Sequence, residues 1–139
     1  MKLILIPVLY LVSLFTDVAS SKIIPTMKIK VGDKTFTSTL SDNPTAVAFR
    51  SLLPMHLKMI ELNGNEKYAE LVNSLPVNAS TPGTIKSGDI MLYGSSTLVL
   101  FYKSFSSSYS YTRIGRIDDP AGFEAALGSG DISVSFEVK

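Results

Sequence analysis

The sequence predicts a mostly β protein whose short strands form a closed or nearly closed barrel with two short capping helices. Three observations support this fold: about seven short segments have strand-like apolar patterns, turn residues separate them, and two cap-and-proline starts precede short helical patterns. Closing the sheet also removes exposed strand edges. We therefore expect one barrel domain over residues 27–139.

The first half of this domain begins with a hairpin. Residues 27–31 alternate apolar and basic side chains, and a Gly-Asp turn leads to a Thr-rich partner strand over residues 34–39. Asn43 and Pro44 predict the start of a helix, because Asn caps free amides and Pro suits the first helical position. Pro54 ends that helix, since it lacks a backbone donor.

A second hairpin follows the helix. Residues 56–62 and 65–71 flank Asn63-Gly64, whose two residues both tolerate positive φ. After a longer connection, residues 90–93 and 97–102 form two more strands, and the nearly continuous apolar run of the latter predicts burial on both faces.

The last part of the domain is predicted to contain a strand, a short helix and a final strand. Residues 111–117 form a strand, and Asp118-Asp119-Pro120 predicts the capped start of the second helix, which Gly128 closes. The final strand, residues 131–138, alternates strictly, so four apolar side chains should face the core: Ile132, Val134, Phe136 and Val138.

The amino-acid composition excludes some kinds of functional site and argues against a nucleic-acid partner. The 139 residues are 45% hydrophobic and 18% charged, as expected for a packed domain. Lys plus Arg total 13 against 12 Asp plus Glu, so charge predicts no nucleic-acid partner. The chain has no Cys and a single His, which excludes thiolate nucleophiles and multi-histidine metal sites. We expect no metal and no cofactor, since no phosphate-loop or dinucleotide pattern occurs.

The N-terminus is typical of a secretory signal peptide over residues 1–20. Lys2 precedes an apolar run over residues 3–15, and small residues follow at a plausible cleavage site after Ala19 or Ser20. An uncleaved anchor is the alternative, but the run falls short of the roughly 20 residues that a spanning helix needs. We therefore expect an exported, periplasmic or extracellular protein with a short linker over residues 21–26 and no membrane association after cleavage.

Several segments of the mature chain resemble cyclophilins. Residues 45–50, Thr-Ala-Val-Ala-Phe-Arg, resemble the opening of the first cyclophilin helix, and residues 62–68, 88–94, 98–102 and 111–117 follow in matching order. Over residues 27–139 the chain resembles the compact bacterial cyclophilin-like family. This resemblance implies a barrel and makes a peptidyl-prolyl cis-trans isomerase the natural enzyme hypothesis.

The isomerase hypothesis requires an apolar pocket and a cation. The cation would weaken the resonance of the imide bond, whose barrier is about 18–20 kcal/mol. Cyclophilins carry this Arg in a Phe-His-Arg stretch, but Asn-Glu-Lys-Tyr-Ala-Glu at residues 65–70 occupies that place here. The resemblance therefore leaves the catalytic residues unknown, while residues 98–102 match the strand of the aromatic pocket.

A Ser-rich aromatic segment supplies the candidate ligand-binding residues. Tyrosines beside serines often make adaptable binding surfaces. If Tyr109, Tyr111 and Arg113 share one strand face, they can hold a peptide or a carboxylate, although a solvated rim is the alternative interpretation. With Phe101 and Tyr102 they form the predicted cleft.

Other polar residues are interpreted structurally. Glu61, Glu66 and Glu70 are interpreted as polar positions around the second hairpin, and His56 lacks a nucleophile motif nearby. The sequence thus predicts an exported cyclophilin-like domain that binds a peptide or small ligand with weak or no catalysis. The alternatives are a prolyl isomerase acting on exported proteins and an interaction protein that uses an outer barrel face.

Overall fold

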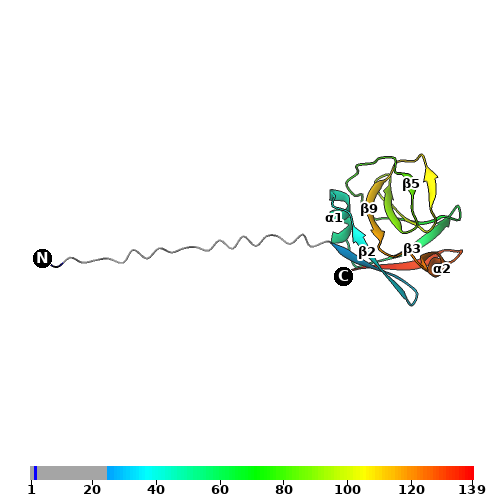
Figure 1. Cartoon of the computed structure of the whole chain (residues 1–139), viewed down its shortest axis with the longest axis horizontal. Helices are drawn as coiled ribbons and strands as arrows, with labels where there is room; N and C mark the ends of the chain where they lie inside the picture. The colour runs from blue at the N-terminus through cyan, green and yellow to red at the C-terminus, as the bar shows by residue number, and fades with distance from the viewer. Residues whose placement is uncertain (1, 3–24) are drawn as a thin grey trace.

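The computed structural model describes residue 2 and residues 25–139. Within this part of the chain, eight antiparallel strands close into a barrel (Figure 1). Around the barrel the order is β1 (Thr26–Val31), β10 (Ile132–Val138), β3 (Met55–Leu62), β4 (Glu66–Glu70), β7 (Thr97–Phe101), β6 (Asp89–Tyr93), β9 (Thr112–Ile117) and β2 (Lys34–Leu40). The predicted barrel class is therefore confirmed.

Two helices and two further strands complete the described part of the chain. The helices α1 (Pro44–Ser51) and α2 (Phe123–Leu127) lie on opposite sides of the barrel in Figure 1. Strands β5 (Gly83–Ile85) and β8 (Phe105–Ser107) pair as a small separate sheet. The predicted signal peptide, apart from residue 2, and residues 21–24 of the predicted linker lie outside the described residues.

Turn chemistry explains the hairpins. Asn63 and Gly64 adopt φ of 56° and 67° between β3 and β4, as the Asn-Gly signal predicts. Gly32 adopts a φ of 60° between β1 and β2. These positive values suit residues with little or no steric penalty in the left-handed region. Both predicted hairpins are confirmed by the strand pairing.

The first helix begins as predicted. The Asn43 side chain accepts a hydrogen bond of 2.7 Å from the Ala46 N–H, and Pro44 occupies the first helical turn. Phe49 on the inner side of α1 packs edge-on against Phe136 of β10, with 5.9 Å between ring centroids. The helix therefore closes one part of the barrel interior.

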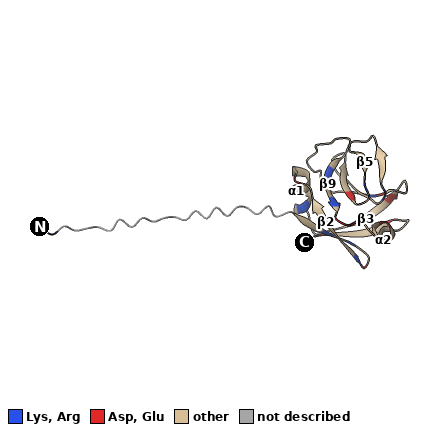
Figure 2. Cartoon of the chain, viewed as in Figure 1, with Lys and Arg blue, Asp and Glu red and all other residues tan. Residues whose placement is uncertain are grey.

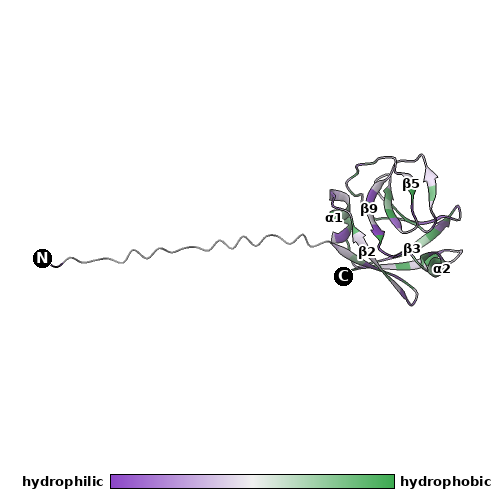
Figure 3. Ribbon diagram, in the orientation of Figure 1, coloured by the Kyte–Doolittle hydropathy of each residue, from purple (hydrophilic) through white to green (hydrophobic). Residues whose placement is uncertain are grey.

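Apolar side chains pack on both sides of the barrel wall. Figure 3 shows hydrophobic and hydrophilic segments alternating through the barrel, and Figure 2 shows both signs of charge scattered over it. On β7, Leu98 and Leu100 join the interior core, whereas Val99 and Phe101 face outward. The predicted two-sided burial of this strand is confirmed. The outer cluster consists of Ile85, Met91, Val99, Phe101 and Tyr111.

The predicted start of the second helix is wrong. Helix α2 is preceded by Gly122 with a φ of 81°, and no side chain caps it. The Asp119 carboxylate instead accepts from the Ala121 N–H at 3.0 Å, and the Asp118 carboxylate accepts from the Thr39 hydroxyl at 2.5 Å. Asp stabilises tight turns by the same chemistry with which it caps helices, so the sequence pattern did not separate the two.

The predicted burial of the last strand is wrong at one residue. Val134 and Phe136 are buried, but Val138 is exposed. The strand runs past the interior to the rim of the barrel, where Val138 lines a depression beside Pro25 and Val47.

Among the described residues, no helix has both the length and the apolar character needed to span a bilayer.

Candidate functional site

A cleft of about 400 Å³ lies on the outer face of β4, β6 and β7. Its volume falls in the range of small-ligand pockets, about 300–1,000 Å³. We call it the tyrosine cleft and define it by its lining residues, which are Leu62, Asn63, Glu66, Tyr68, Glu70, Tyr93, Thr97, Val99, Tyr109 and Tyr111.

Strand register builds the floor of the cleft. Successive side chains of a strand point to opposite faces, and paired residues place theirs on the same face. Glu70 pairs with Thr97, which pairs with Tyr93 on β6. Tyr68 and Val99 form the next row. Three strands that are separate in sequence therefore bring their outward side chains into one surface.

Aromatic rings in edge-on and tilted contacts form one wall of the cleft. The ring of Tyr93 lies 5.8 Å from that of Tyr111 and 6.4 Å from that of Tyr109, measured between centroids. Tyr111 also packs edge-on against Phe101 at 5.5 Å. Two backbone hydrogen bonds between Ser80 and Tyr111 anchor this segment. The wall thus has a buried base and an exposed rim, since Tyr93 and Tyr109 are 48% and 64% exposed.

The charged groups that line the cleft are carboxylates. The Glu70 carboxylate accepts hydrogen bonds from the hydroxyls of Ser96 at 3.1 Å and Thr97 at 2.5 Å. Glu66 is only 8% exposed, and among the described residues no hydrogen bond or ion pair reaches its carboxylate.

Burial and neighbouring negative charge raise the pKa values of two cleft residues, Glu66 and Tyr111. Burial, followed by the negative charge of Glu61, raises the pKa of Glu66. Burial also raises the pKa of Tyr111, and the charge of Glu66 adds to this rise. The cleft therefore has a negative interior that no protein cation neutralises among the described lining residues.

The neighbouring residue Lys67 points to the opposite face of β4. Its side chain is fully buried, and its ammonium donates to the carbonyls of Gly128 at 2.8 Å and Gly130 at 2.6 Å. A third bond of 3.1 Å reaches the Glu61 carboxylate. Since an ammonium has three donors, Lys67 is completely satisfied.

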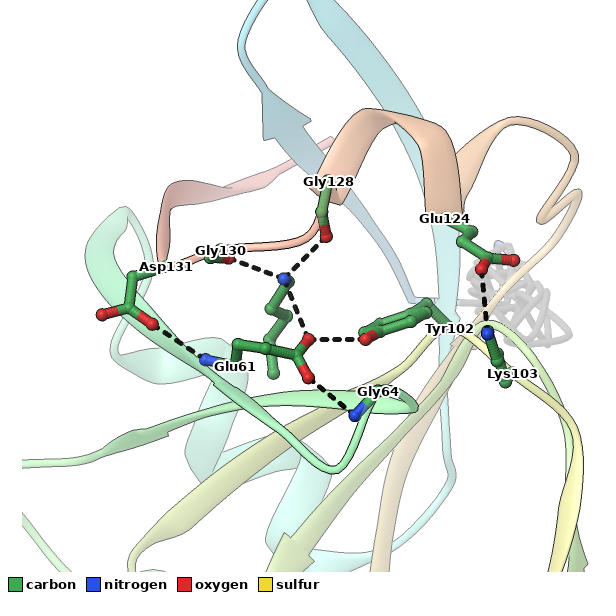
Figure 4. Close-up of polar contacts among 9 residues, drawn as sticks. Glu61, Gly64, Tyr102, Lys103, Glu124, Gly128, Gly130 and Asp131 are labelled. Carbon is green, nitrogen blue, oxygen red and sulfur yellow. Dashed lines mark hydrogen bonds and ion pairs between the residues drawn. The ribbon is translucent and has the colours of Figure 1, made fainter.

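Glu61 is the centre of this buried network (Figure 4). It accepts from the Tyr102 hydroxyl at 2.5 Å and from the Gly64 N–H at 2.8 Å. Burial alone would raise the pKa of Glu61, but the bonds from Tyr102 and Lys67 outweigh it and lower that pKa. Burial, the bond to Glu61 and its charge raise the pKa of Tyr102. The network links the β3–β4 hairpin to the segment between α2 and β10.

The structure brings together three of the five predicted site residues. Tyr109 and Tyr111 line the tyrosine cleft, and Phe101 lies beneath its wall. Tyr102 instead belongs to the barrel interior and the Glu61 network. Arg113 lies in a separate depression, where its guanidinium is 4.0 Å from the Asp89 carboxylate.

Sequence analysis missed the β4 side of the cleft. Glu66, Tyr68 and Glu70 are two positions apart, which places all three on one face of a strand. That spacing was the available signal. It did not show that Tyr93 and Tyr109, far away in the sequence, face the same surface.

A family model described as the cyclophilin-like family matches residues 29–137. The search of curated proteins gave no match.

Proposed function

Since the chain belongs to the cyclophilin-like family, we propose that it is a binding module that holds a peptide or small ligand in the tyrosine cleft, with weak or no catalysis. The observation that carries this proposal is the cleft itself, in which tyrosines from β4, β6 and the segment before β9 meet over one sheet face.

The construction of the cleft favours binding. Phe101 and Tyr111 are buried and fix the base of the aromatic wall. Tyr93 and Tyr109 expose large ring surfaces that lose little conformational freedom on contact with a ligand. A pre-organised base with exposed aromatic contacts lowers the ordering cost of binding.

The charges in the cleft favour binding over isomerisation. Isomerisation by the cyclophilin chemistry needs a cation near the imide nitrogen, whereas Glu66 and Glu70 are the charged lining residues here. Lys67, their neighbour on β4, has all three donors engaged in the barrel interior. The charge of the cleft is therefore opposite to the one that this catalysis uses.

Export is a separate part of the proposal. It rests on Lys2, the apolar run over residues 3–15 and the small residues that follow. N-terminal sequencing of protein recovered outside the cytoplasm should give a first residue of Ser20 or Ser21. Recovery only from the cytoplasm with Met1 in place would contradict export.

Ligand binding can be tested by NMR on the isotope-labelled full chain. The probes are blocked pentapeptides Ala-Ala-X-Ala-Ala in which X is Lys, Arg, Leu or Glu. At least one should shift the amide signals of cleft residues saturably, and Tyr109→Ala should weaken that binding at least about fivefold, as expected for an aromatic contact worth about 1 kcal/mol.

Val47→Ala is the matched control, because Val47 is exposed on α1 and does not line the cleft. It should bind like the parent chain. If no probe shifts the cleft signals of the folded chain, the proposed function is wrong.

A proline isomerisation assay distinguishes the alternative function. We expect little or no acceleration over the uncatalysed rate at high protein concentration. Saturable acceleration that is lost in Tyr109→Ala would instead support the peptidyl-prolyl isomerase.

A further inference from the structure

Glu66 is a buried acidic residue whose carboxylate has no partner among the described residues. The residue is 92% removed from solvent, since 8% of its surface stays exposed, and that exposure opens into the tyrosine cleft. An ionised carboxylate at such a position is destabilising unless it is paired. Perturbed, unpaired groups in clefts are therefore candidates for ligand contact.

Within residues 25–139, no Lys or Arg forms an ion pair with Glu66. Lys67 is the adjacent residue but is held on the other face by Gly128, Gly130 and Glu61. The Arg113 guanidinium lies in a different depression, near Asp89. A counter-charge for the ionised form of Glu66 would then come from outside the described residues.

The surroundings of Glu66 suit an organic cation. The exposed rings of Tyr93 and Tyr109 stand in the same cleft, and aromatic faces attract ammonium and guanidinium groups. Glu66 and Glu70 are four residues apart on one strand, which separates their backbones by about 13 Å. That spacing suits an elongated ligand that passes Tyr68, and it does not suit one metal ion shared by both carboxylates.

Resting on the proposed function, we propose that the ligand of the tyrosine cleft carries an alkylammonium or guanidinium group that pairs with the Glu66 carboxylate. The aliphatic part of the ligand lies along Tyr68 and Val99 on the floor. Glu70 contributes a second, more exposed negative charge, held in place by the hydroxyls of Ser96 and Thr97.

The same pentapeptides test this inference. The Lys and Arg probes should bind the cleft at least about tenfold more tightly than the Leu and Glu probes, as expected for a charge-assisted contact away from solvent. Equal or tighter binding of Leu or Glu would overturn the inference and leave the binding function standing. If no probe binds the cleft, both are overturned.

A free amine distinguishes the two sources of such a group. Pentylamine carries the ammonium and the aliphatic chain without a peptide backbone. Binding of pentylamine comparable to that of the Lys probe supports a small amine ligand, and binding of the Lys probe alone supports a basic peptide. Either result agrees with the proposed cation contact.

Glu66→Gln tests the residue itself. It should weaken binding of the Lys probe about tenfold while the midpoint of unfolding stays equal or rises, because the variant removes a buried charge. Glu137→Gln is the control, since Glu137 lies on β10 in an exposed ion pair with Lys30. Unchanged affinity for the Lys probe in Glu66→Gln would overturn the proposal.

Glu70→Gln provides an independent second variant. Its carboxylate is exposed, so its loss should weaken the Lys probe only about threefold, in line with a solvent-screened contact. A loss larger than that of Glu66→Gln would overturn the assignment of the main contact to Glu66.

Discussion

The two faces of β4 differ in whether their charged side chains have hydrogen-bond partners among the described residues. On the inner face, the Lys67 ammonium is fully buried and donates to three oxygens, one of them from Glu61. On the outer face, the adjacent residue Glu66 is 8% exposed, and its carboxylate has no protein partner among the described residues where it borders the cleft. One strand thus carries both a satisfied and an unsatisfied charge.

This difference separates a structural charge from a binding charge. Because the donors of Lys67 are all used, this residue stabilises the connection between the β3–β4 hairpin and the segment after α2. Because Glu66 has no partner among the described residues and borders a cleft, burial disfavours its ionised form and its carboxylate is available to a ligand. The comparison predicts that substitutions on the two faces change stability with opposite sign.

The largest effect is expected from Lys67→Met. The variant removes the ammonium that donates to the Glu61 carboxylate and to the carbonyls of Gly128 and Gly130, and it should lower the free energy of unfolding by about 3 kcal/mol. Urea denaturation measures this change. Lys30→Met, in an exposed ion pair with Glu137, is the control and should stay within about 0.5 kcal/mol of the parent. Similar losses in both variants would contradict the special role of Lys67.

The next largest effect is a difference in stability between two Glu-to-Gln variants, one on each face of the sheet. Glu61→Gln should lower the free energy of unfolding by about 1–2 kcal/mol, since it weakens hydrogen bonds from Lys67 and Tyr102 to a charged acceptor. Glu66→Gln should leave it unchanged or higher. Both are measured by chemical denaturation at neutral pH. If Glu66→Gln destabilises the protein as much as Glu61→Gln, the two faces do not differ as described.

Glu66 and Glu61 should also change the pH dependence of the free energy of unfolding in opposite directions. The pKa of Glu66 is raised above its usual value of 4.5, so its protonated form stabilises the fold below that pH and stability falls as pH rises through the folded pKa. The pKa of Glu61 is lowered, so its contribution is complete above 4.5 and is lost as pH falls through the folded pKa.

Denaturation curves between acidic and neutral pH measure this. The advantage of Glu66→Gln over the parent should grow as pH rises above 4.5, and the deficit of Glu61→Gln should shrink as pH falls below it. Tyr111 also faces Glu66, but its pKa is raised and it stays neutral in this range. Parallel curves for the two variants would contradict the assigned shifts.

The smallest effect concerns the rim of the cleft. Tyr109→Ala should change the free energy of unfolding by no more than about 0.5 kcal/mol, because the side chain is mostly exposed. Thermal unfolding compared with the parent is the measurement. A loss of about 2 kcal/mol or more would place Tyr109 in the framework of the protein and not on a free binding surface.

Much of the fold was predictable because its signals are local. Asn43-Pro44 fixes the start of α1, and Asn63-Gly64 fixes the β3–β4 turn through interactions within a few residues. The double burial of residues 97–102 follows from their continuous apolar run. The Asp118-Asp119 signal failed because turns and helix caps use the same local hydrogen bonds, such as the one that Asp119 accepts from the Ala121 N–H, and because Asp118 binds Thr39 far away in the sequence.

The site was predictable only in part. The sequence grouped Phe101, Tyr109 and Tyr111 because their aromatic side chains are concentrated in one stretch, and the structure places these three together at the cleft. Tyr102 was placed with them by proximity in sequence, although alternation along the strand sends it to the opposite face from Phe101. Arg113 was also grouped with the tyrosines because it is near them in sequence. It borders a different depression, because the register of the strands and not the distance in sequence decides its neighbours.

The sequence by itself determined the barrel class, the turns, the first helix and the aromatic character of the site. These follow from side-chain periodicity and short-range hydrogen bonding, which depend on neighbouring residues. Only the tertiary structure decided that Lys67 has three hydrogen-bond partners while Glu66 has none among the described residues. Two of those partners, the carbonyls of Gly128 and Gly130, are 61 and 63 positions away from Lys67, and long-range pairing of strands, which no local pattern encodes, brings them together.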